Sequence, residues 1–215
     1  VEESPAPGLP ETVRARMAKA AVSLAQAQHY AGAGTVEFIV DAQTFEFFFL
    51  EMNTRIQVEH PVTEMVTGLD LVALQLRLAM GDPLSELRQD TLAVRGHSIE
   101  VRLYAENPGK MFLPSPGRLE RLVLPTADGG VRVDTGVREG DVITAYYDPM
   151  IAKIIAWGPD RTSALRTLSG ALAATHAEGI STNIEFLRRA VAHPAFVAGD
   201  VFTGFIDAFK PELVG

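Results

Sequence analysis

The sequence predicts an α+β protein with two consecutive parts. Residues 10–30 form a stretch of helical period, and the two apolar runs that follow it are typical of a β-hairpin. The second half holds several short strands followed by helices, an order typical of an α+β domain. Composition changes around residues 83–90, so we expect one part over 1–83 and another over 84–215. A chain of 215 residues is long enough for two small domains with cores of their own.

The composition limits the classes of function. The chain is 47% hydrophobic and 21% charged, as in ordinary soluble globular proteins. Its net charge of −8 argues against a nucleic-acid partner. The lack of cysteine excludes disulfides, thiolate catalysis and cysteine-ligated zinc. No apolar run is long enough to span a bilayer and no signal peptide is visible, so we expect no membrane partner. The expected location is the cytoplasm or, in a eukaryote, the mitochondrial matrix.

The first half has recognisable helix starts and stops. Pro10 suits the first turn of a helix, and Glu11 complements the positive end of the helix dipole. Asp70 is a good N-cap for a later helix, which Gly81 would end. In chain order we expect a helix from Pro10 to about Tyr30, strands at 35–40 and 45–50 joined by residues 41–44, a helical turn at 62–67, and a helix at 71–80 whose Leu71, Leu74 and Leu78 pack a core.

The second half has short strands before a helical end. Asp160 is placed to cap one helix, and Thr182 or Asn183 to start the next. Residues 1–7 are expected to be a strand end and a linker that belong to something longer. In chain order we expect strands at 98–104, 117–124, 131–134, 142–145 and 151–157, then helices from 161 to about 176, from 182 or 183 to 192, and from 203 to 209.

One stretch, residues 51–61, carries most of the functional signal. In an extended chain alternate side chains point to opposite faces, with about 6.6 Å between neighbours on one face. Nine extended residues would therefore line one face with acid, amide, guanidinium, amide and acid groups. A solvated strand face also alternates, and it is the competing interpretation. We interpret the row as the floor of an active site; its members are Glu51, Asn53, Arg55, Gln57 and Glu59.

Two carboxylates face each other across the expected hairpin. If the turn is centred near Thr44, Glu37 and Glu51 lie opposite or nearly opposite each other. Like charges across a strand pair are destabilising unless something neutralises them. A divalent cation would do so, and hard oxygen ligands favour magnesium or manganese. The alternatives are a Glu on a solvated face, or a register that separates the two carboxylates.

Arg102 is the candidate in the second half. From Ser98 to Tyr104 polar and apolar residues alternate, so Glu100 and Arg102 share a face. Taken alone, such an arginine is more often a surface charge than a catalytic group. His60 precedes a proline at the end of the polar row, where it can shape a turn. The other histidines show no metal-ligand spacing.

Together these residues resemble biotin carboxylases, members of the ATP-grasp superfamily. The run over 51–64 is similar to the signature of that family, and the resemblance covers nearly the whole chain. Residues 134–140 and 183–209 are most similar to α subunits of acyl-CoA carboxylases, above all the 3-methylcrotonyl-CoA type beside the propionyl-CoA and acetyl-CoA types. The other matching segments are 34–38, 95–102, 112–117, 147–151 and 179–183.

The resemblance implies both a fold and a reaction. The fold would be the C-terminal part of an ATP-grasp domain over 1–83, followed by the biotin carboxylase C-terminal α+β domain over 84–215. The reaction would be that of a ligase: ATP phosphorylates bicarbonate to carboxyphosphate, and the carboxyl group passes to the ureido nitrogen of biotin. Catalysis of phosphoryl transfer is mostly positioning and charge neutralisation. Glu37, Glu51 and Asn53 would accordingly be ligands of Mg²⁺ or Mn²⁺.

The resemblance also implies how the remaining candidates act. Arg55 would hold bicarbonate through its guanidinium fork, assisted by Gln57 and by the backbone of Val58. Glu59 would be the base that deprotonates bicarbonate. Arg102 would contact biotin and stabilise its enolate, an oxyanion role.

Further parts and partners follow from the same resemblance. The N-terminal domain, the glycine-rich lid and the lysines that grip ATP phosphates would precede Val1, so the isolated chain is expected to be inactive. Expected partners of the complete enzyme are a biotin carboxyl carrier domain, a carboxyltransferase β subunit and bicarbonate, in an oligomeric assembly. Two alternatives stay open. One is another ATP-grasp ligase, similar to carbamoyl-phosphate synthetase, which shares the acidic metal site; the other is a non-catalytic assembly module.

Overall fold

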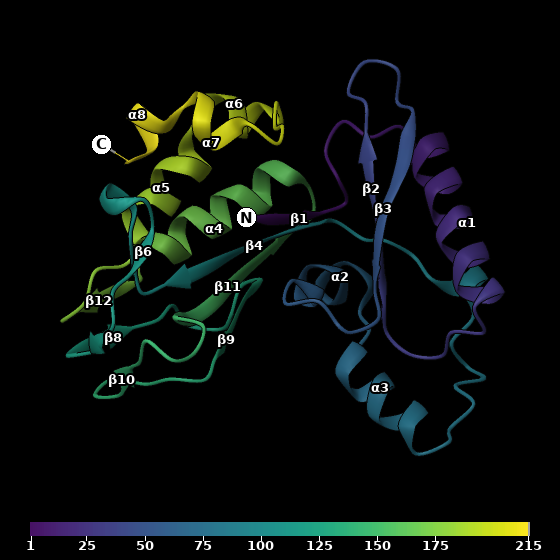
Figure 1. The fold of residues 1–215 in the computed structure, drawn as a ribbon, viewed down its shortest axis with the longest axis horizontal. Coiled ribbons are helices and arrows are strands. Elements are labelled where there is room, and N and C mark those ends of the chain that lie inside the picture. Colours follow the sequence, from purple (N-terminus) through teal and green to yellow (C-terminus); the bar gives the residue numbers. More distant parts are fainter. Residues whose placement is uncertain (215) are drawn as a thin grey trace. The chain divides into compact units, whose positions relative to one another are not determined.

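The structure, a computed structural model, describes residues 1–214 and divides into two compact units. The first unit is residues 6–94. The second joins Val1–Pro5 to the chain from Arg95 onward. In Figure 1 the first unit runs from the purple helix through helix α3 (Leu71–Ala79) to the teal segment after it, and the second holds the purple strand at the N-terminus together with the later teal, green and yellow elements.

The compact units do not coincide with the expected domain limits. Residues 84–94 stay with the first unit, in which Arg77 forms ion pairs with Asp82 and Glu86 (2.6 and 2.5 Å). These pairs tie the segment after α3 back to that helix. The assignment of family domains to 1–83 and 84–215 concerns sequence limits rather than compactness, and it remains a prediction.

The first unit contains the expected helix and hairpin. The first helix ends at Ala27 rather than near Tyr30, because His29 has a positive φ of 50°. The N–H of His29 bonds to the Gln26 carbonyl and that of Tyr30 to the Ala25 carbonyl, the Schellman pattern of a helix end. The elements of the unit are α1 (Glu11–Ala27), β2 (Thr35–Val40), β3 (Phe47–Asn53), α2 (His60–Thr67), α3 (Leu71–Ala79) and the 3-10 turn η1 (Gln89–Thr91).

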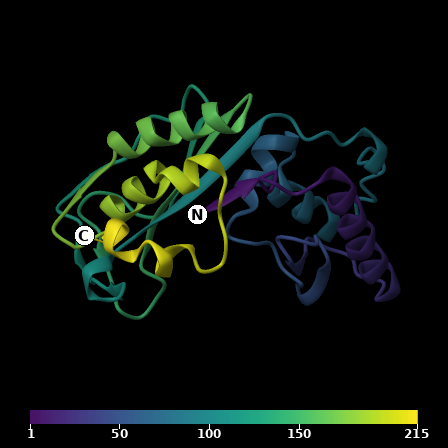
Figure 2. The ribbon, with the colours of Figure 1, turned by 90° about the horizontal axis from the view of Figure 1, so that it is seen from above.

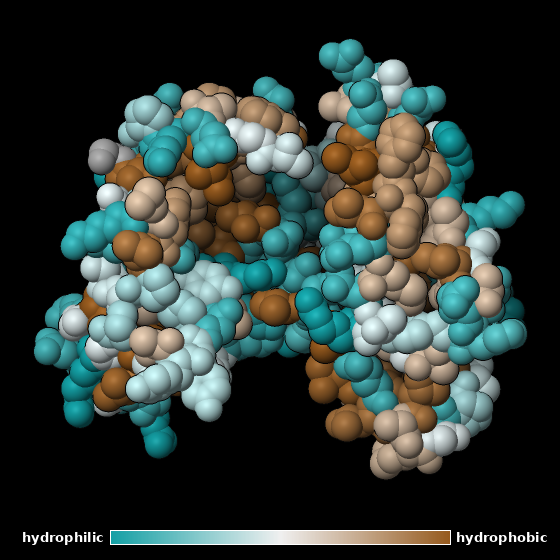
Figure 3. All heavy atoms as spheres, viewed as in Figure 1, coloured by the Kyte–Doolittle hydropathy of each residue, from teal (hydrophilic) through white to brown (hydrophobic). Residues whose placement is uncertain are grey.

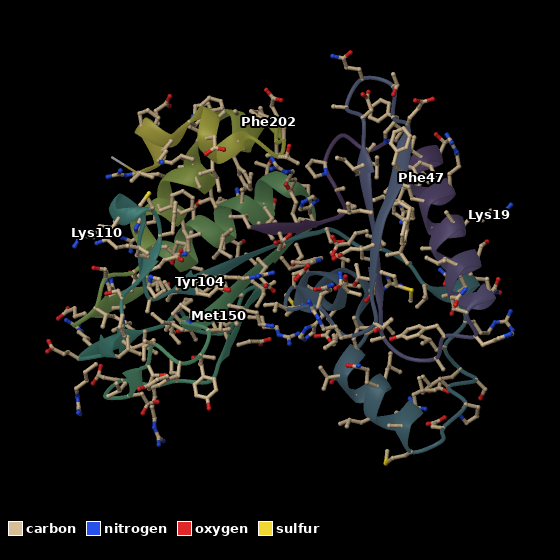
Figure 4. The ribbon with its side chains drawn as sticks, in the orientation of Figure 1. Lys19, Phe47, Tyr104, Lys110, Met150 and Phe202 are labelled. Carbon is tan, nitrogen blue, oxygen red and sulfur yellow. The ribbon has the colours of Figure 1, made fainter. Side chains whose placement is uncertain are left out.

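The hairpin is antiparallel, with its loop closed by a side chain. The Asp41 carboxylate accepts from the N–H groups of Gln43 and Thr44 (2.9 and 2.7 Å), as in an Asx turn. β3 begins at Phe47 and not at residue 45, because Phe45 has a φ of 56° and belongs to the loop. Phe47 points toward α1 (Figure 4), and its ring centroid lies 5.2 Å from the Arg16 guanidinium carbon.

Helix α3 matches one expectation and contradicts another. The Asp70 carboxylate accepts from the Ala73 N–H (2.8 Å), so the predicted N-cap of α3 is confirmed. The expectation that Leu71, Leu74 and Leu78 pack a core is wrong, since no residue of α3 is buried. In this unit a two-stranded sheet offers little surface for a helix to cover.

The second unit is built on a four-stranded antiparallel sheet of order β1-β4-β11-β9. Helices α4 and α5 lie over this sheet (Figures 1 and 2). The remaining strands form short two-stranded pairs. The strands are β1 (Glu2–Ser4), β4 (His97–Tyr104), β5 (Glu106–Asn107), β6 (Leu113–Pro114), β7 (Gly117–Arg118), β8 (Arg121–Val123), β9 (Val131–Thr135), β10 (Val142–Ile143), β11 (Met150–Gly158) and β12 (His176–Glu178). The helices are η2 (Pro108–Lys110), α4 (Arg161–Ala173), α5 (Ile184–Ala192), α6 (Pro194–Ala198), α7 (Phe205–Ala208) and α8 (Lys210–Val214).

Three expectations for this unit need correction. The strand expected at 117–124 is two strands, because β7 pairs with β10 while β8 pairs with β12. The helix expected to reach about His176 ends at Ala173, since His176 opens the strand partner of β8. The helix expected at 203–209 is interrupted at Phe209, between α7 and α8.

Two clusters of buried apolar residues form the core of the second unit. The larger joins β4 and β11 to α4 and α5, with Leu168 and Leu172 fully buried at its centre. A smaller cluster joins the ends of the same strands to the short pairs, around Leu103 and Leu119. Within the described residues, no helix is both long and apolar enough to cross a membrane.

Glu3 is the centre of an ion-pair cluster in the second unit. Its carboxylate accepts from Nε2 of His97 (2.7 Å) and from Nε and Nη2 of Arg161 (2.7 and 3.1 Å). Arg161 also donates to the carbonyls of Phe196 and Val197 (2.8 Å each), so the cluster links β1, β4, α4 and α6. Burial raises the pKa of Glu3, but the hydrogen bonds from His97 and Arg161 outweigh it and leave that pKa below its usual value.

We expect Glu3→Gln to lower the free energy of unfolding of this unit by about 3 kcal/mol at neutral pH, because it leaves Arg161 and His97 without their carboxylate. Because the pKa of Glu3 is lowered on folding, its carboxylate stabilises the fold fully above the unfolded-state pKa of about 4.3. That contribution is lost as the pH falls through the lower pKa of the folded state. The difference between the two proteins should therefore shrink at acidic pH. Urea unfolding followed by Trp157, the only tryptophan of the chain, measures it. The exposed Glu120→Gln is the control, and an equal loss there would contradict the assignment.

Candidate functional site

The two carboxylates predicted to oppose each other are direct partners in the hairpin. Glu37 of β2 pairs with Glu51 of β3. Leu50 is left without a partner, because the next pair is Phe38 with Phe49. This β-bulge puts Glu51 on the face of Glu37 and opposite to Phe49, since paired residues share a face.

Asn53 completes this cluster. Its side-chain N–H groups donate to Oε1 of Glu37 (2.8 Å) and to Oε1 of Glu51 (2.9 Å). The structure thus brings together the three residues predicted as metal ligands. In this arrangement the amide offsets the repulsion between the carboxylates; rotating it by a half-turn would present an oxygen instead. The described residues hold no group of three or more His, Cys, Asp or Glu that could bind a metal. In the predicted set the third metal ligand is instead the amide of Asn53.

The expected nine-residue row is wrong beyond Asn53. β3 ends there, Arg55 lies in a bend, and residues 57–59 turn into α2 at His60. The alternation of the sequence persists where the strand does not. The guanidinium of Arg55 donates through Nη1 to Oε1 of Gln57 (3.0 Å) and to the Ile56 carbonyl (3.2 Å).

A pocket of about 250 Å³ is formed at this turn. Arg55, Gln57 and Glu59 line it, together with residues of the segment before β2, such as Gly34, and with His60 of α2. A guanidinium, an amide and a carboxylate thus share one concave site in the first unit. Such a set can hold a small planar anion at the guanidinium and accept its proton at the carboxylate.

Arg102 lies on β4, in the second unit. Its Nη2 is 3.7 Å from Oε1 of Glu2 on β1, and its side chain is 28% exposed, so it is neither a fully solvated surface charge nor a core residue. It lines a cavity of about 520 Å³ with Tyr104, Glu106 and the aromatic side chains under α5–α7. Figure 3 shows the brown walls of a hollow in this unit. Tyr104 and its strand partner Met150 lie side by side in Figure 4.

Asn183 is a residue of this cavity that sequence reasoning assigned only to a helix start. It is 4% exposed and makes no side-chain cap for α5. Its Oδ1 accepts from the Tyr104 N–H (2.9 Å), and its Nδ2 donates to the Arg102 carbonyl (3.1 Å) and to Glu106 (3.1 Å). Burial, reinforced by the charge of Asp148, raises the pKa of Glu106 against the effect of the Asn183 hydrogen bond. The sequence did not indicate this role, because an asparagine just before an amphipathic helix is typical of an N-cap.

Comparison with known proteins identifies the family. Residues 100–208 match the family described as biotin carboxylase C-terminal domain, and residues 1–87 match the carbamoyl-phosphate synthase L chain, ATP binding domain. The chain belongs to the biotin carboxylase family. The predicted fold class, an ATP-grasp part followed by the biotin carboxylase C-terminal domain, is confirmed.

Named relatives agree with this assignment. The chain is 52% identical to the mitochondrial methylcrotonoyl-CoA carboxylase subunit alpha of Dictyostelium discoideum over 100% of its length, and 49% identical to the propionyl-CoA carboxylase alpha chain of Ruegeria pomeroyi over 99%. It spans 30% and 34% of those two proteins, so it corresponds to the biotin carboxylase part of acyl-CoA carboxylase α subunits.

A solved structure of the family matches closely. It is the biotin carboxylase domain dimer of the 2-oxoglutarate carboxylase of Hydrogenobacter thermophilus, in complex with MgADP, ADP and bicarbonate. The match has a TM-score of 0.95 and 38% identity, and it covers 99% of this chain and 46% of that one.

We expect Asn53→Ala to weaken the hairpin in the absence of metal by about 1 kcal/mol, the usual net contribution of a hydrogen bond. The substitution removes the donor shared by Glu37 and Glu51. Adding Glu51→Gln should restore part of the loss, because it removes the like charge. Amide hydrogen exchange of β2 and β3 in EDTA measures the opening free energy. Gln43→Ala, in the hairpin loop, is the control; a double variant weaker than Asn53→Ala would contradict the repulsion argument.

Proposed function

We propose that a protein containing this chain is an ATP- and bicarbonate-dependent biotin carboxylase that serves an acyl-CoA carboxylase. The observation that carries the proposal is the pocket in which Arg55, Gln57 and Glu59 meet, directly after the Glu37, Glu51 and Asn53 cluster in the chain. An anion-binding pocket that follows an acidic cluster suits the transfer of the γ-phosphoryl group from a metal-bound nucleotide to bicarbonate.

The acidic cluster fits an oxygen-preferring divalent cation. Glu37, Glu51 and Asn53 would hold Mg²⁺ or Mn²⁺, which supplies positive charge to the phosphates of ATP. Mg²⁺ in nucleotide sites usually takes only one or two protein carboxylates, and this cluster would offer it two. Ile39 lies two residues beyond Glu37 on the same strand face and is 55% exposed, an apolar surface that a nucleotide base can cover.

The pocket residues divide the work on bicarbonate. Arg55 binds the anion through its fork of N–H donors, while the Gln57 side chain and the Val58 N–H hold its other oxygens. Glu59 accepts the bicarbonate proton, which turns the anion into a better nucleophile toward the γ-phosphate of ATP. The products of that attack are carboxyphosphate and ADP, which leaves with the electrons of the broken P–O bond.

Arg102 acts on the second half-reaction. Bound biotin supplies the ureido nitrogen that accepts the carboxyl group of carboxyphosphate, whose C–O bond breaks to release inorganic phosphate. Arg102 places its guanidinium at the wall of a largely apolar cavity, where charge is less screened than in water, and stabilises negative charge on the ureido oxygen.

The partners and the location are proposed from the resemblance to acyl-CoA carboxylases. A biotin carboxyl carrier domain and a carboxyltransferase β subunit are the proposed partners, with assembly into an oligomer. The relatives cited are named as carboxylases of methylcrotonoyl-CoA and propionyl-CoA, and we assign the same class of acceptor here. The cytoplasm, or the mitochondrial matrix in a eukaryote, is the proposed location.

The experiment that tests the assignment separates Glu59 from Arg102 in a protein that spans the full length of these relatives and carries these residues. Glu59→Gln keeps size but removes the base, so both bicarbonate-dependent ATP hydrolysis and biotin carboxylation should fall by about 10²–10⁴-fold. Arg102→Ala should lower biotin carboxylation by about 10²–10³-fold and ATP hydrolysis much less. Equal losses of the two activities in Arg102→Ala would show that its role is wrong. Full activity of Glu59→Gln would place the base elsewhere.

The metal assignment predicts a second result in the same protein. Glu37→Gln and Glu51→Gln should each raise the Mg²⁺ concentration needed for half-maximal ATP hydrolysis by about tenfold or more. Even residues that only hydrogen-bond to a metal ligand change metal affinity or activity by about 10–100-fold when they are mutated. A titration with Mg²⁺ at fixed ATP measures the effect. Glu46→Gln, an exposed change on the same hairpin, should leave the titration unchanged. If all three variants behave alike, the two carboxylates are not the ligands.

A further inference from the structure

We propose that His60 is a positioning residue of the bicarbonate pocket and that it acts on one peptide plane. The inference rests on the proposed function of Arg55 and Val58 and adds the group that fixes their turn. His60 itself touches neither the reacting atoms nor the nucleotide in this proposal. It holds the Gln57 carbonyl, and through it the direction of the next N–H.

The imidazole of His60 makes a hydrogen bond to the main chain of Gln57. Nδ1 of His60 lies 2.8 Å from the Gln57 carbonyl oxygen. A carbonyl oxygen can only accept, so Nδ1 carries the hydrogen. The backbone N–H of His60 reaches the same oxygen at 3.3 Å, a longer contact. The side chain is therefore the better of these two donors to that oxygen.

The Gln57 carbonyl matters because of what shares its peptide plane. The C=O of one residue and the N–H of the next are coplanar and point in opposite directions in a trans peptide. Holding the Gln57 oxygen on the side of His60 thus fixes the Val58 N–H on the other side. Val58 N–H is the backbone donor proposed for bicarbonate. A rotation of this plane would replace that donor with a carbonyl oxygen, which repels an anion.

The side chain of Gln57 is held as well, by Arg55. Gln57 accepts from Arg55 at its side-chain oxygen (3.0 Å) and from His60 at its main-chain oxygen. Gln57 is therefore fixed at both its side chain and its backbone, each by a residue that lines the pocket. The side chain of His60 is only 14% exposed, so its ring has little freedom to leave this position.

The ring is bounded on its far side by Glu64. Nε2 of His60 lies 3.9 Å from Oε2 of Glu64, beyond a hydrogen bond, whereas Oε1 of Glu64 accepts from the Leu71 N–H at the start of α3 (2.6 Å). Glu64 thus joins α2 to α3 and supports the ring without binding it closely. The two nitrogens of His60 consequently have different tasks, and only Nδ1 acts on the turn.

This difference makes a sharp test possible, again in the full-length protein. In asparagine the amide nitrogen is bonded to Cγ, as Nδ1 is in histidine; in glutamine it lies one atom further, near the place of Nε2. His60→Asn should keep the bicarbonate KM within about twofold of the original, while His60→Gln should raise it by about three- to tenfold, the value of one hydrogen bond. The ATP KM should not change, and kcat at saturating bicarbonate should change less than the bicarbonate KM does in His60→Gln.

Controls separate this proposal from the function on which it rests. His176→Asn, an exposed change in the second unit, should have no effect, and the melting temperature of each variant checks folding. If Arg55→Ala leaves the bicarbonate KM unchanged, the pocket assignment and this inference both fall. If Arg55→Ala raises it while His60→Asn and His60→Gln behave alike, only the inference falls. Should His60→Gln not fold, His60→Asn decides alone, because a folded variant with a tenfold higher bicarbonate KM overturns the proposal.

Discussion

Two carboxylates facing each other across neighbouring strands are the constraint around which the first unit's site is arranged. Glu37 and Glu51 are strand partners, and their repulsion has to be offset for the hairpin to close. The bulge at Leu50 makes the conflict unavoidable, because without it the side chain of Glu51 would point to the face of Phe49. Asn53 offsets part of the cost by donating to both. The repulsion that remains between Glu37 and Glu51 is the reason for proposing a cation as the partner of this pair.

The hairpin and the opposed carboxylates were predictable from the sequence because both rest on local rules. The apolar strand runs and the loop between them predict the strand register to within the one residue of the bulge. That register is enough to place Glu37 near Glu51. The turn over residues 55–59 was not predictable in the same way. Its polar and apolar residues alternate as a strand would, although the backbone has already left the extended conformation at Arg55. Alternation reports which side chains are polar, but it does not show where hydrogen-bonded pairing stops.

The failure of the extended row has a physical meaning for the site. Side chains on one face of a strand are about 6.6 Å apart, so Arg55 and Glu59 would lie about 13 Å from each other in a strand. No anion of three oxygens could touch both. The turn solves this by folding the alternating polar residues around one pocket, with α2 starting directly after Glu59. A strand end suits Glu51 and Asn53, two proposed metal ligands that are only two residues apart, whereas the proposed anion site needs a turn.

Arg102 illustrates a different way of holding a charged group. It lies on β4, next to the point where pairing with β1 ends at Glu2 and Glu100. Beyond that point the side chain of Asn183 takes the place of a strand, because it donates to the Arg102 carbonyl and accepts from the Tyr104 N–H as a neighbouring backbone would. These contacts were not predictable from the sequence, because Asn183 lies far from Arg102 and Tyr104 in the chain and resembles an ordinary N-cap. The backbone under Arg102 is thus held on one side by the core strand β11 and on the other by a buried amide. The role proposed for Arg102 needs such a fixed base, because electrostatic stabilisation of a transition state depends on donors that are already in place.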